Sequence, residues 1–291
     1  MKIIDGKKIA DQLRAVIQDQ VSHLSGRPPC LSVIMIGDHP ASRIYVRAKR
    51  KACEIAGIAS IQIDLPATTS EAEAMAAIRE MNGRKDVDAI LLQLPLPSHL
   101  KPEKILSLID PAKDVDGLHP INAGKLLQGE TDGFVPCTPL GIQHLLIETL
   151  GSIAGKRVLI LGRSTIVGKP LAALLMQNNA RANSTVTIAH SKSTHLEALC
   201  KEADIVIAAM GQPQLIKGSM IKPGAILIDV GINRVDDKTT PKGYKIVGDI
   251  DEDSVAGVCG ALTPVPGGVG PMTIAMLLHN TLLGYQRRCA S

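Results

Sequence analysis

A tyrosine and a lysine four residues apart form the first pair in this chain with the means to do chemistry. Tyr45 and Lys49 lie in segment 42–56, whose apolar period predicts a helix, so their side chains share one face. That face continues with small apolar residues, namely Ala52, Cys53 and Ala56. Burial there lowers the pKa of a lysine from about 10.4 towards a value useful for proton transfer. The alternative is an ordinary lysine with its stem on apolar surface and its amine in water.

Two polar residues in other segments extend this candidate set. Gln93 lies near the end of an apolar run, 89–94, that predicts a buried strand, and its amide supplies an acceptor and a donor without adding charge. Asp116 lies in the loop Asp114-Val115-Asp116-Gly117, where an ionised carboxylate can accept two hydrogen bonds from an amidine-like ring edge. A polar strand end and an Asx turn are the ordinary alternatives.

Glycine and proline make up six of the eight residues in 264–271. Glycine is costly to order and proline fixes φ, so this segment predicts a loop whose main chain can approach a ligand closely. The apolar period over 272–283 predicts a helix directly after the loop, whose free N–H groups can face a polar ligand. A rigid interdomain linker is the alternative.

A strand, a glycine turn and a helix follow one another over 158–178. The apolar run 158–161 leads into Gly162-Arg163-Ser164 and then Ile166-Val167-Gly168, after which 171–178 has a helical period. This order binds pyrophosphate through main-chain N–H groups and the helix dipole. Because the spacing differs from Gly-x-Gly-x-x-Gly, an ordinary β–α turn stays open as the alternative.

The end of the next strand favours NADP over NAD. A site for NAD usually has an acidic residue about 20 residues after the glycines, which binds the ribose hydroxyls. Here the strand 186–189 ends in His190-Ser191-Lys192 instead. We expect Arg163, Ser191 and Lys192 to offer donors and positive charge to a 2′-phosphate. The alternative for Lys192 is an ordinary solvated lysine at the surface.

Two later loops are expected to flank the nicotinamide half of a dinucleotide. Gly211 follows the apolar run 205–209, and Gly231-Ile232-Asn233 follows 226–230. Ligands of open α/β sheets bind at the carboxyl ends of parallel strands, where both loops fall. The cofactor residues expected from the sequence are therefore Gly162, Arg163, Ser164, Ile166, Gly168, Ser191, Gly211 and Ile232.

The order of these segments predicts an α/β fold with mostly parallel sheets. Continuous apolar runs alternate with segments of helical period, which is typical of buried strands covered by helices on both faces. A first series has strands at 31–36, 61–65 and 89–94 and helices at 42–56 and 70–81. The second series has strands at 158–161, 186–189, 205–209, 226–230 and 245–247, with helices at 171–178 and 196–201. A further helix is expected at 140–149.

Length and composition set the domain count and exclude several classes of partner. A chain of 291 residues favours two domains, which we place at 1–139 and 140–270, with helix 271–291 packing back on the first. The net charge of +4, without a block of lysine and arginine, argues against nucleic acid. The six cysteines are far apart, which predicts free thiols, no metal site and a cytoplasmic location. We expect no membrane segment.

Taken in order, these motifs resemble the bifunctional methylenetetrahydrofolate dehydrogenase/cyclohydrolase family. The similarity spans nearly the whole chain. It rests on Ala41-Ser42-x-x-Tyr45-Val46-x-x-Lys49-x-Lys51-Ala52-Cys53, Gln93-Leu94-Pro95-Leu96-Pro97, Lys113-Asp114-Val115-Asp116-Gly117, Pro136-Cys137-Thr138-Pro139, Gly162-Arg163-Ser164, Ile166-Val167-Gly168, His190-Ser191, Gly231-Ile232-Asn233 and the segment 264–271.

The resemblance implies a two-domain enzyme of one-carbon metabolism. Folate would bind the first domain and NADP a Rossmann-like second domain, with a cleft between them, and the family usually forms homodimers. Methylenetetrahydrofolate would be oxidised, and the methenyl product hydrolysed to 10-formyltetrahydrofolate. Folate substrates with anionic glutamate tails suit the mild positive charge.

The resemblance also implies roles for the candidate residues. Lys49 would transfer protons, Gln93 would hold that lysine, and Tyr45 would stack on the aminobenzoyl ring and orient it. Asp116 would bind the pterin edge, while Pro266, Gly267 and Gly268 would line the folate side. Two rival functions remain: another two-domain NADP oxidoreductase acting on a keto or amino acid, and a catalytically silent folate- or nucleotide-sensing module.

Overall fold

The computed structural model describes residues 1–240 and 243–290, and the chain divides into two units. Unit 1 comprises residues 1–10 and 138–273, and unit 2 comprises residues 11–137 and 274–291. Ser291, the last residue of the expected C-terminal helix, lies outside the described residues. Within the described part of the chain, no helix is both long and apolar enough to cross a membrane.

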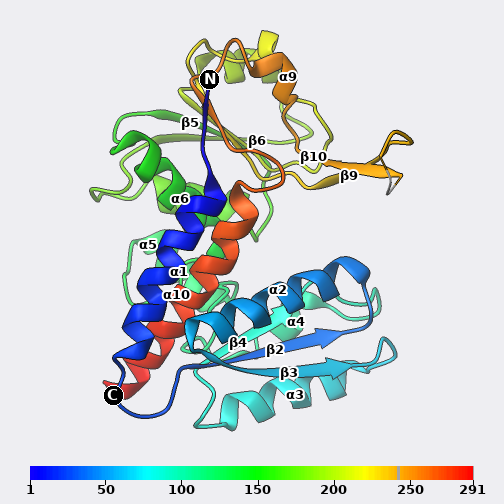
Figure 1. Ribbon diagram of the computed structural model, residues 1–291, viewed down its shortest axis with the longest axis vertical. Helices are drawn as coiled ribbons and strands as arrows, with labels where there is room; N and C mark the ends of the chain where they lie inside the picture. The colour runs from blue at the N-terminus through cyan, green and yellow to red at the C-terminus, as the bar shows by residue number, and fades with distance from the viewer. Residues whose placement is uncertain (241–242, 291) are drawn as a thin grey trace. The chain divides into compact units, whose positions relative to one another are not determined.

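Unit 2 is built on a three-stranded parallel sheet with the order β3-β2-β4. The strands are β2 (Cys30–Ile36), β3 (Ala59–Leu65) and β4 (Ala89–Gln93). Helices α2 (Pro40–Ala56) and α3 (Glu71–Gly83) lie on opposite faces of this sheet (Figure 1). Because it is covered on both faces, β2 is buried along its whole length, as a continuous apolar run predicts.

Local sequence signals set the ends of the two covering helices. Ser70 accepts a hydrogen bond from the Glu73 N–H, and the Glu73 side chain accepts one from the Ser70 N–H, so a capping box begins α3. Helix α2 ends at Gly57, whose φ of 72° is left-handed and favours glycine. The remaining helices of unit 2 are α4 (Pro102–Leu106), α5 (Pro120–Gln128) and most of α1 (Gly6–Ser22) and α10 (Val269–Cys289).

Unit 1 contains a six-stranded parallel sheet with the order β1-β11-β8-β7-β5-β6. Its strands are β1 (Lys2–Ile3), β5 (Arg157–Leu161), β6 (Thr185–Ala189), β7 (Ile205–Ala208), β8 (Ile226–Asp229) and β11 (Ala261–Leu262). The helices are α6 (Cys137–Leu150), α7 (Gly168–Leu175), α8 (Leu196–Glu202), α9 (Glu252–Val255) and the 3₁₀ turn η1 (Gly218–Met220). The two parallel sheets confirm the predicted α/β class.

One expected strand belongs to a different sheet from the one predicted. The apolar pattern predicts that segment 245–247 belongs to the parallel series, but β10 (Tyr244–Val247) pairs antiparallel with β9 (Asn233–Asp236). The connection between them is short, whereas a parallel crossover needs a dozen residues or more, so only a hairpin is possible. Sequence reasoning also missed α1, α4, α5, α9, η1, β1, β9 and β11. Two of these are two-residue strands, too short for an apolar period.

Candidate active site

Lys49 and Gln93 meet in unit 2 between helix α2 and the end of strand β4. The Lys49 Nζ donates to the Gln93 Oε1 over 2.9 Å, and the Gln93 Nε2 donates to the Leu94 carbonyl over 2.7 Å. The second bond fixes the amide so that its oxygen faces the amine. Alternation along β4 explains the placement: Ile90 and Leu92 pack towards α3, so Gln93 points to the other face.

The environment of Lys49 shifts its ionisation towards the neutral form. Burial of the amine lowers the pKa of Lys49 from its ordinary value of 10.5, and the nearby charge of Asp116 opposes that shift without cancelling it. Tyr45 lies one turn earlier on α2 and stays 37% exposed, which leaves ring surface free for a ligand. The structure thus brings Lys49, Gln93 and Asp116 together, with Tyr45 one helical turn away.

The loop that carries Asp116 is held by its two polar neighbours. Lys113 is 1% exposed, and its Nζ donates to three carbonyls at the end of α3 and just beyond it, those of Met81, Asn82 and Arg84, over 2.8–3.1 Å. These carbonyls have no intrahelical partners, so the lysine closes the C-terminal end of α3. Its ammonium therefore has a structural role, since its hydrogen bonds are made to main-chain carbonyls.

Asp114 closes the loop on the other side. Its carboxylate accepts hydrogen bonds from the His119 N–H and the Asn122 Nδ2, both over 2.8 Å, and from the Leu118 N–H over 3.3 Å. Burial raises the pKa of Asp114 to about 7, against the opposing effect of these donors. Of the three charged residues in Lys113-Asp114-Val115-Asp116, only Asp116 faces Lys49.

Sequence reasoning assigned no role to two residues that support this loop, Asn280 and Cys137. The Asn280 Nδ2, on α10, donates to the Val115 carbonyl over 2.8 Å and to the Val135 carbonyl over 3.0 Å. The buried Cys137 thiol donates to the same Val115 carbonyl over 3.3 Å. The signal for Asn280 was an amide within the apolar run of α10, where a buried polar group needs a partner.

The glycine turn of unit 1 is tightly packed. Gly162 has a φ of 125°, and a Cβ there would overlap the Ala209 carbonyl oxygen. A Cβ on Gly168, the first residue of α7, would overlap the Gly162 carbonyl oxygen. The Ser164 hydroxyl accepts from the Val167 N–H over 3.1 Å, which holds the turn against the helix. This close path of main chain to a helix start fits a pyrophosphate.

The residues expected to bind a 2′-phosphate lie together at the carboxyl ends of two neighbouring strands. Strands β5 and β6 pair in register as parallel neighbours, from Arg157 opposite Thr185 to Leu161 opposite Ala189, so the loops after them lie side by side. Arg163 follows β5, and Ser191 and Lys192 follow β6, and all three are exposed. Ile166 is 40% exposed in the same turn. The His190 Nδ1 accepts from the Lys192 N–H over 3.2 Å and shapes the second loop.

The other two expected cofactor loops follow the neighbouring strands β7 and β8, also at the carboxyl ends of the strands. Gly211 comes after β7 and Ile232 after β8, and these strands also pair in parallel. A buried aspartate at the end of β8, Asp229, accepts hydrogen bonds from the Gly231 and Ile250 N–H groups over 2.9 and 2.8 Å. Burial raises the pKa of Asp229 to about 6, with these donors opposing.

Only residues 264–268 of the glycine–proline segment form the predicted loop in unit 1, because α10 already begins at Val269 and includes the last three residues of the segment. Gly267 has a φ of 114°, and the Gly268 N–H donates to the Pro264 carbonyl over 2.8 Å. A Cβ on Gly6, the first residue of α1, would overlap the Gly268 carbonyl oxygen. Glycine is thus required at position 6 for this contact, whereas a Cβ on Gly268 would instead overlap the Pro264 carbonyl oxygen and Thr263 within the loop's own surroundings.

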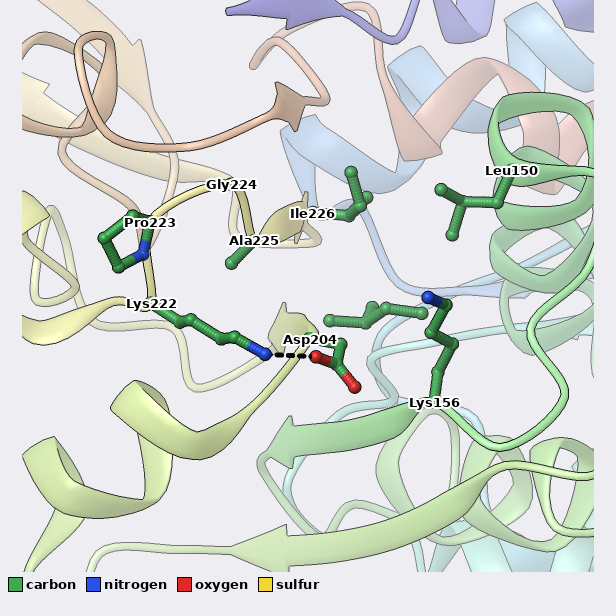
Figure 2. Close-up of a pocket in the computed structure, with 9 residues that line it drawn as sticks. Leu150, Lys156, Asp204, Lys222, Pro223, Gly224, Ala225 and Ile226 are labelled. Carbon is green, nitrogen blue, oxygen red and sulfur yellow. Dashed lines mark hydrogen bonds and ion pairs between the residues drawn. The ribbon is translucent and has the colours of Figure 1, made fainter.

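A pocket of about 220 Å³ opens at the opposite end of the sheet of unit 1, where β7 and β8 begin (Figure 2). In it the Asp204 carboxylate accepts from the Lys222 Nζ over 2.6 Å and from the Arg157 N–H over 2.9 Å. Ligands of open parallel sheets bind at the carboxyl ends of the strands. We therefore assign this pocket no part in cofactor binding.

Comparison with known proteins places this geometry in a family. Residues 4–116 match the model described as "Tetrahydrofolate dehydrogenase/cyclohydrolase, catalytic domain", and residues 136–289 match that of the NAD(P)-binding domain of the same family. A curated relative from Protochlamydia amoebophila, "Bifunctional protein FolD", is 53% identical over 98% of both chains.

Solved structures agree with the sequence comparison. The bifunctional methylenetetrahydrofolate dehydrogenase/cyclohydrolase from Campylobacter jejuni is 43% identical, with a TM-score of 0.93 over 99% of both chains. The Trypanosoma brucei enzyme, solved with NADP and an inhibitor, is 38% identical with the same TM-score, covering 99% of this chain and 98% of its own. This chain therefore belongs to the tetrahydrofolate dehydrogenase/cyclohydrolase family, as its motifs predicted.

Proposed function

We propose that the two units of this enzyme perform different parts of its function. The protein oxidises 5,10-methylenetetrahydrofolate with NADP and hydrolyses the resulting methenyl cation to 10-formyltetrahydrofolate, the two activities of its family. The proposed division gives proton transfer and most of the folate recognition to side chains of unit 2. Cofactor binding is assigned to the loops of unit 1.

In this proposal, Lys49 transfers the protons that hydrolysis requires. A water must lose a proton as it attacks the methenyl carbon, and a ring nitrogen must gain one as the ring opens. A buried amine with a lowered pKa can accept the first proton and return it. The bond from Lys49 to Gln93 supports this role most strongly, because it orients the amine through an uncharged partner and so adds no charge that would raise its pKa.

Asp116 and Tyr45 bind and orient the substrate. The Asp116 carboxylate accepts hydrogen bonds from the pterin edge, and the exposed Tyr45 ring stacks on the aminobenzoyl group. Bound NADP⁺ supplies the acceptor for a hydride. Lone pairs on the two flanking nitrogens assist its departure, so this step needs orientation more than a strong base. Pro266, Gly267 and Gly268 offer backbone to the folate.

The loops of unit 1 hold the dinucleotide. Gly162, Ser164, Ile166 and Gly168 form the turn that receives the pyrophosphate, and the close-packed glycines fit that use. Arg163 and Ser191, with Lys192 beside them, bind the 2′-phosphate. Gly211 and Ile232 flank the nicotinamide half.

We further propose that the enzyme is a cytoplasmic homodimer that accepts polyglutamylated folates. Among the described residues, β6 is hydrogen-bonded to another strand on one side only, and Thr185, Thr187 and Ile188 of this edge are exposed. Such an edge favours pairing with a second chain. Five buried free cysteines suit a reducing compartment. Light scattering of the protein and of Ile188→Lys tests the dimer.

One assay tests the proposed function against its rivals. Absorbance changes of NADPH and of the methenyl product are followed together while methylenetetrahydrofolate and NADP⁺ are mixed with the enzyme. The proposal expects NADPH to accumulate while the methenyl signal rises transiently and decays. A rival oxidoreductase reduces NADP⁺ only with a keto- or amino-acid partner, and a sensing module yields neither signal.

A further inference from the structure

A second buried carboxylate in unit 1 binds two of the expected cofactor loops directly. Asp249 is 0% exposed, and its Oδ2 accepts from the N–H groups of Met210 and Gly211 over 2.6 and 2.9 Å. Its Oδ1 accepts from the Gln212 N–H and from the Asn233 Nδ2, both over 2.9 Å. One side chain thus joins the loop after β7 to the loop after β8.

Asp249 is itself placed by the aspartate at the end of β8. The Asp249 N–H donates to the Asp229 Oδ1 over 2.9 Å. The neighbouring glycines make the approach possible, because a Cβ on Gly231 would overlap the Asp249 carboxylate and one on Gly248 would overlap that of Asp229. Gly231 is part of the motif singled out in the sequence, and this contact explains why a glycine stands there.

The hydrogen bonds of Asp249 indicate that its carboxylate holds the loops in position. All four donors to Asp249 come from protein groups, so its acceptor capacity is used within the fold. Three of them are consecutive backbone N–H groups, 210–212, which lock the turn that carries Gly211. A buried carboxylate bound this way costs free energy unless its donors stay in place, so the loops and the carboxylate hold each other.

We propose that Asp249 is a positioning residue for the dinucleotide cofactor: it fixes the Gly211 and Asn233 loops in the conformation that receives the nicotinamide half. This inference rests on the proposed assignment of those loops to the cofactor. Asp249 touches neither cofactor nor substrate and acts through the backbone it binds. Loss of its carboxylate therefore weakens cofactor binding while leaving the proton chemistry of Lys49 intact.

Asp249→Asn tests this directly. The amide keeps the size of the side chain but turns one acceptor into a donor that opposes two N–H groups. We expect the Kd for NADP⁺, measured by calorimetry on the full chain, to rise about 10-fold or more. Hydrolysis of supplied methenyltetrahydrofolate, which needs no NADP⁺, is expected to stay within about 2-fold.

Two further variants make the result decisive. Asp204→Asn removes a carboxylate charge at the opposite end of the same sheet, within the pocket of Figure 2, and is expected to leave the Kd within about 2-fold. Asn233→Ala removes only one donor to Asp249 and is expected to raise the Kd about 3-fold. It decides the question if Asp249→Asn fails to fold.

An unchanged Kd in a folded Asp249→Asn, or in Asn233→Ala where the first variant does not fold, overturns the proposal. A parallel loss of methenyl hydrolysis also overturns it, because that would show a general effect on the fold. The calorimetric readout stands apart from the proposed function: a wild-type protein that binds NADP⁺ but oxidises no methylenetetrahydrofolate would refute that function and leave the Asp249 result valid.

Discussion

The two units of this enzyme use buried polar groups in different ways. In unit 2 the proposed site consists mainly of side chains, with Lys49 on a helix, Gln93 at a strand end and Asp116 on a braced loop. In unit 1 the proposed site consists largely of loop backbone, apart from the side chains expected at the 2′-phosphate, and the buried carboxylate of Asp249 accepts hydrogen bonds from these loops. Proton transfer needs a titratable atom at one point, whereas a dinucleotide needs a shaped surface of N–H groups. Substitutions should therefore separate the two activities.

Lys49→Met should have the largest effect and should fall on hydrolysis. Without the amine, no group transfers the protons, and general acid–base catalysis contributes about 10²- to 10⁴-fold. The dehydrogenase should keep more of its activity, since hydride departure needs mainly orientation. Lys49→Arg is the matched control: it keeps the charge but cannot deprotonate, so hydrolysis should be lost there too. Intact methenyl hydrolysis in either variant would refute the assignment.

Gly168→Ala should show the reverse pattern. The added Cβ would overlap the Gly162 carbonyl oxygen and displace the turn, so we expect NADP⁺ affinity to fall about 10- to 100-fold while methenyl hydrolysis persists. Gly257→Ala, where a Cβ meets no atom within 4 Å, is the control in the same unit. Equal NADP⁺ affinity in the two variants would count against the pyrophosphate turn.

Asp116→Ala should weaken both reactions through folate. Loss of charged hydrogen bonds to the pterin edge is worth about 1.5–3 kcal/mol, or roughly a 10- to 100-fold rise in the KM for folate substrates. The KM for NADP⁺ should not change. Steady-state kinetics with each substrate varied checks this, and an unchanged folate KM would remove Asp116 from the site.

Arg163→Ala should have a smaller and more selective effect. If its guanidinium binds the 2′-phosphate, the KM for NADP⁺ should rise about 10-fold and that for NAD⁺ should barely move. The ratio of the two KM values is the measurement. Equal changes for both cofactors would contradict the assignment.

Asp114→Asn should alter the pH dependence of stability. Because burial raises the pKa of Asp114 from 3.8 to about 7, the folded protein binds a proton between these values that the unfolded chain does not. Stability from this group is thus present at low pH and lost as the pH rises through about 7, with a slope of at most about 1.4 kcal/mol per pH unit. From pH 7 to pH 6, wild type should gain stability relative to the variant in urea unfolding. A constant difference would disprove the shift.

Much of the fold was predictable because most of the buried strands are continuous apolar runs, and several of them, such as β2 and β5, are followed by a helix. The α/β class and most strands of both parallel sheets followed from this pattern. The hairpin of β9 and β10 did not, since periodicity says nothing of pairing direction. At the site, residue type marked Lys49 and Gln93 as candidates. Asp249 could not be found this way, because its partners are mostly main-chain groups that only the folded chain brings near. Asn280 stands out as an amide within an apolar run, but its main-chain partners are likewise known only from the fold.

The ionisation of Lys49 tests the central claim most directly. Its side-chain resonances, labelled with ¹³C and assigned by their absence in Lys49→Met, report the pKa of the amine in the intact enzyme. The account predicts titration clearly below 10.5, the ordinary value for lysine, because burial outweighs the attraction of Asp116. Titration at or above 10.5 would show a solvated, permanently charged amine and would contradict its role in proton transfer.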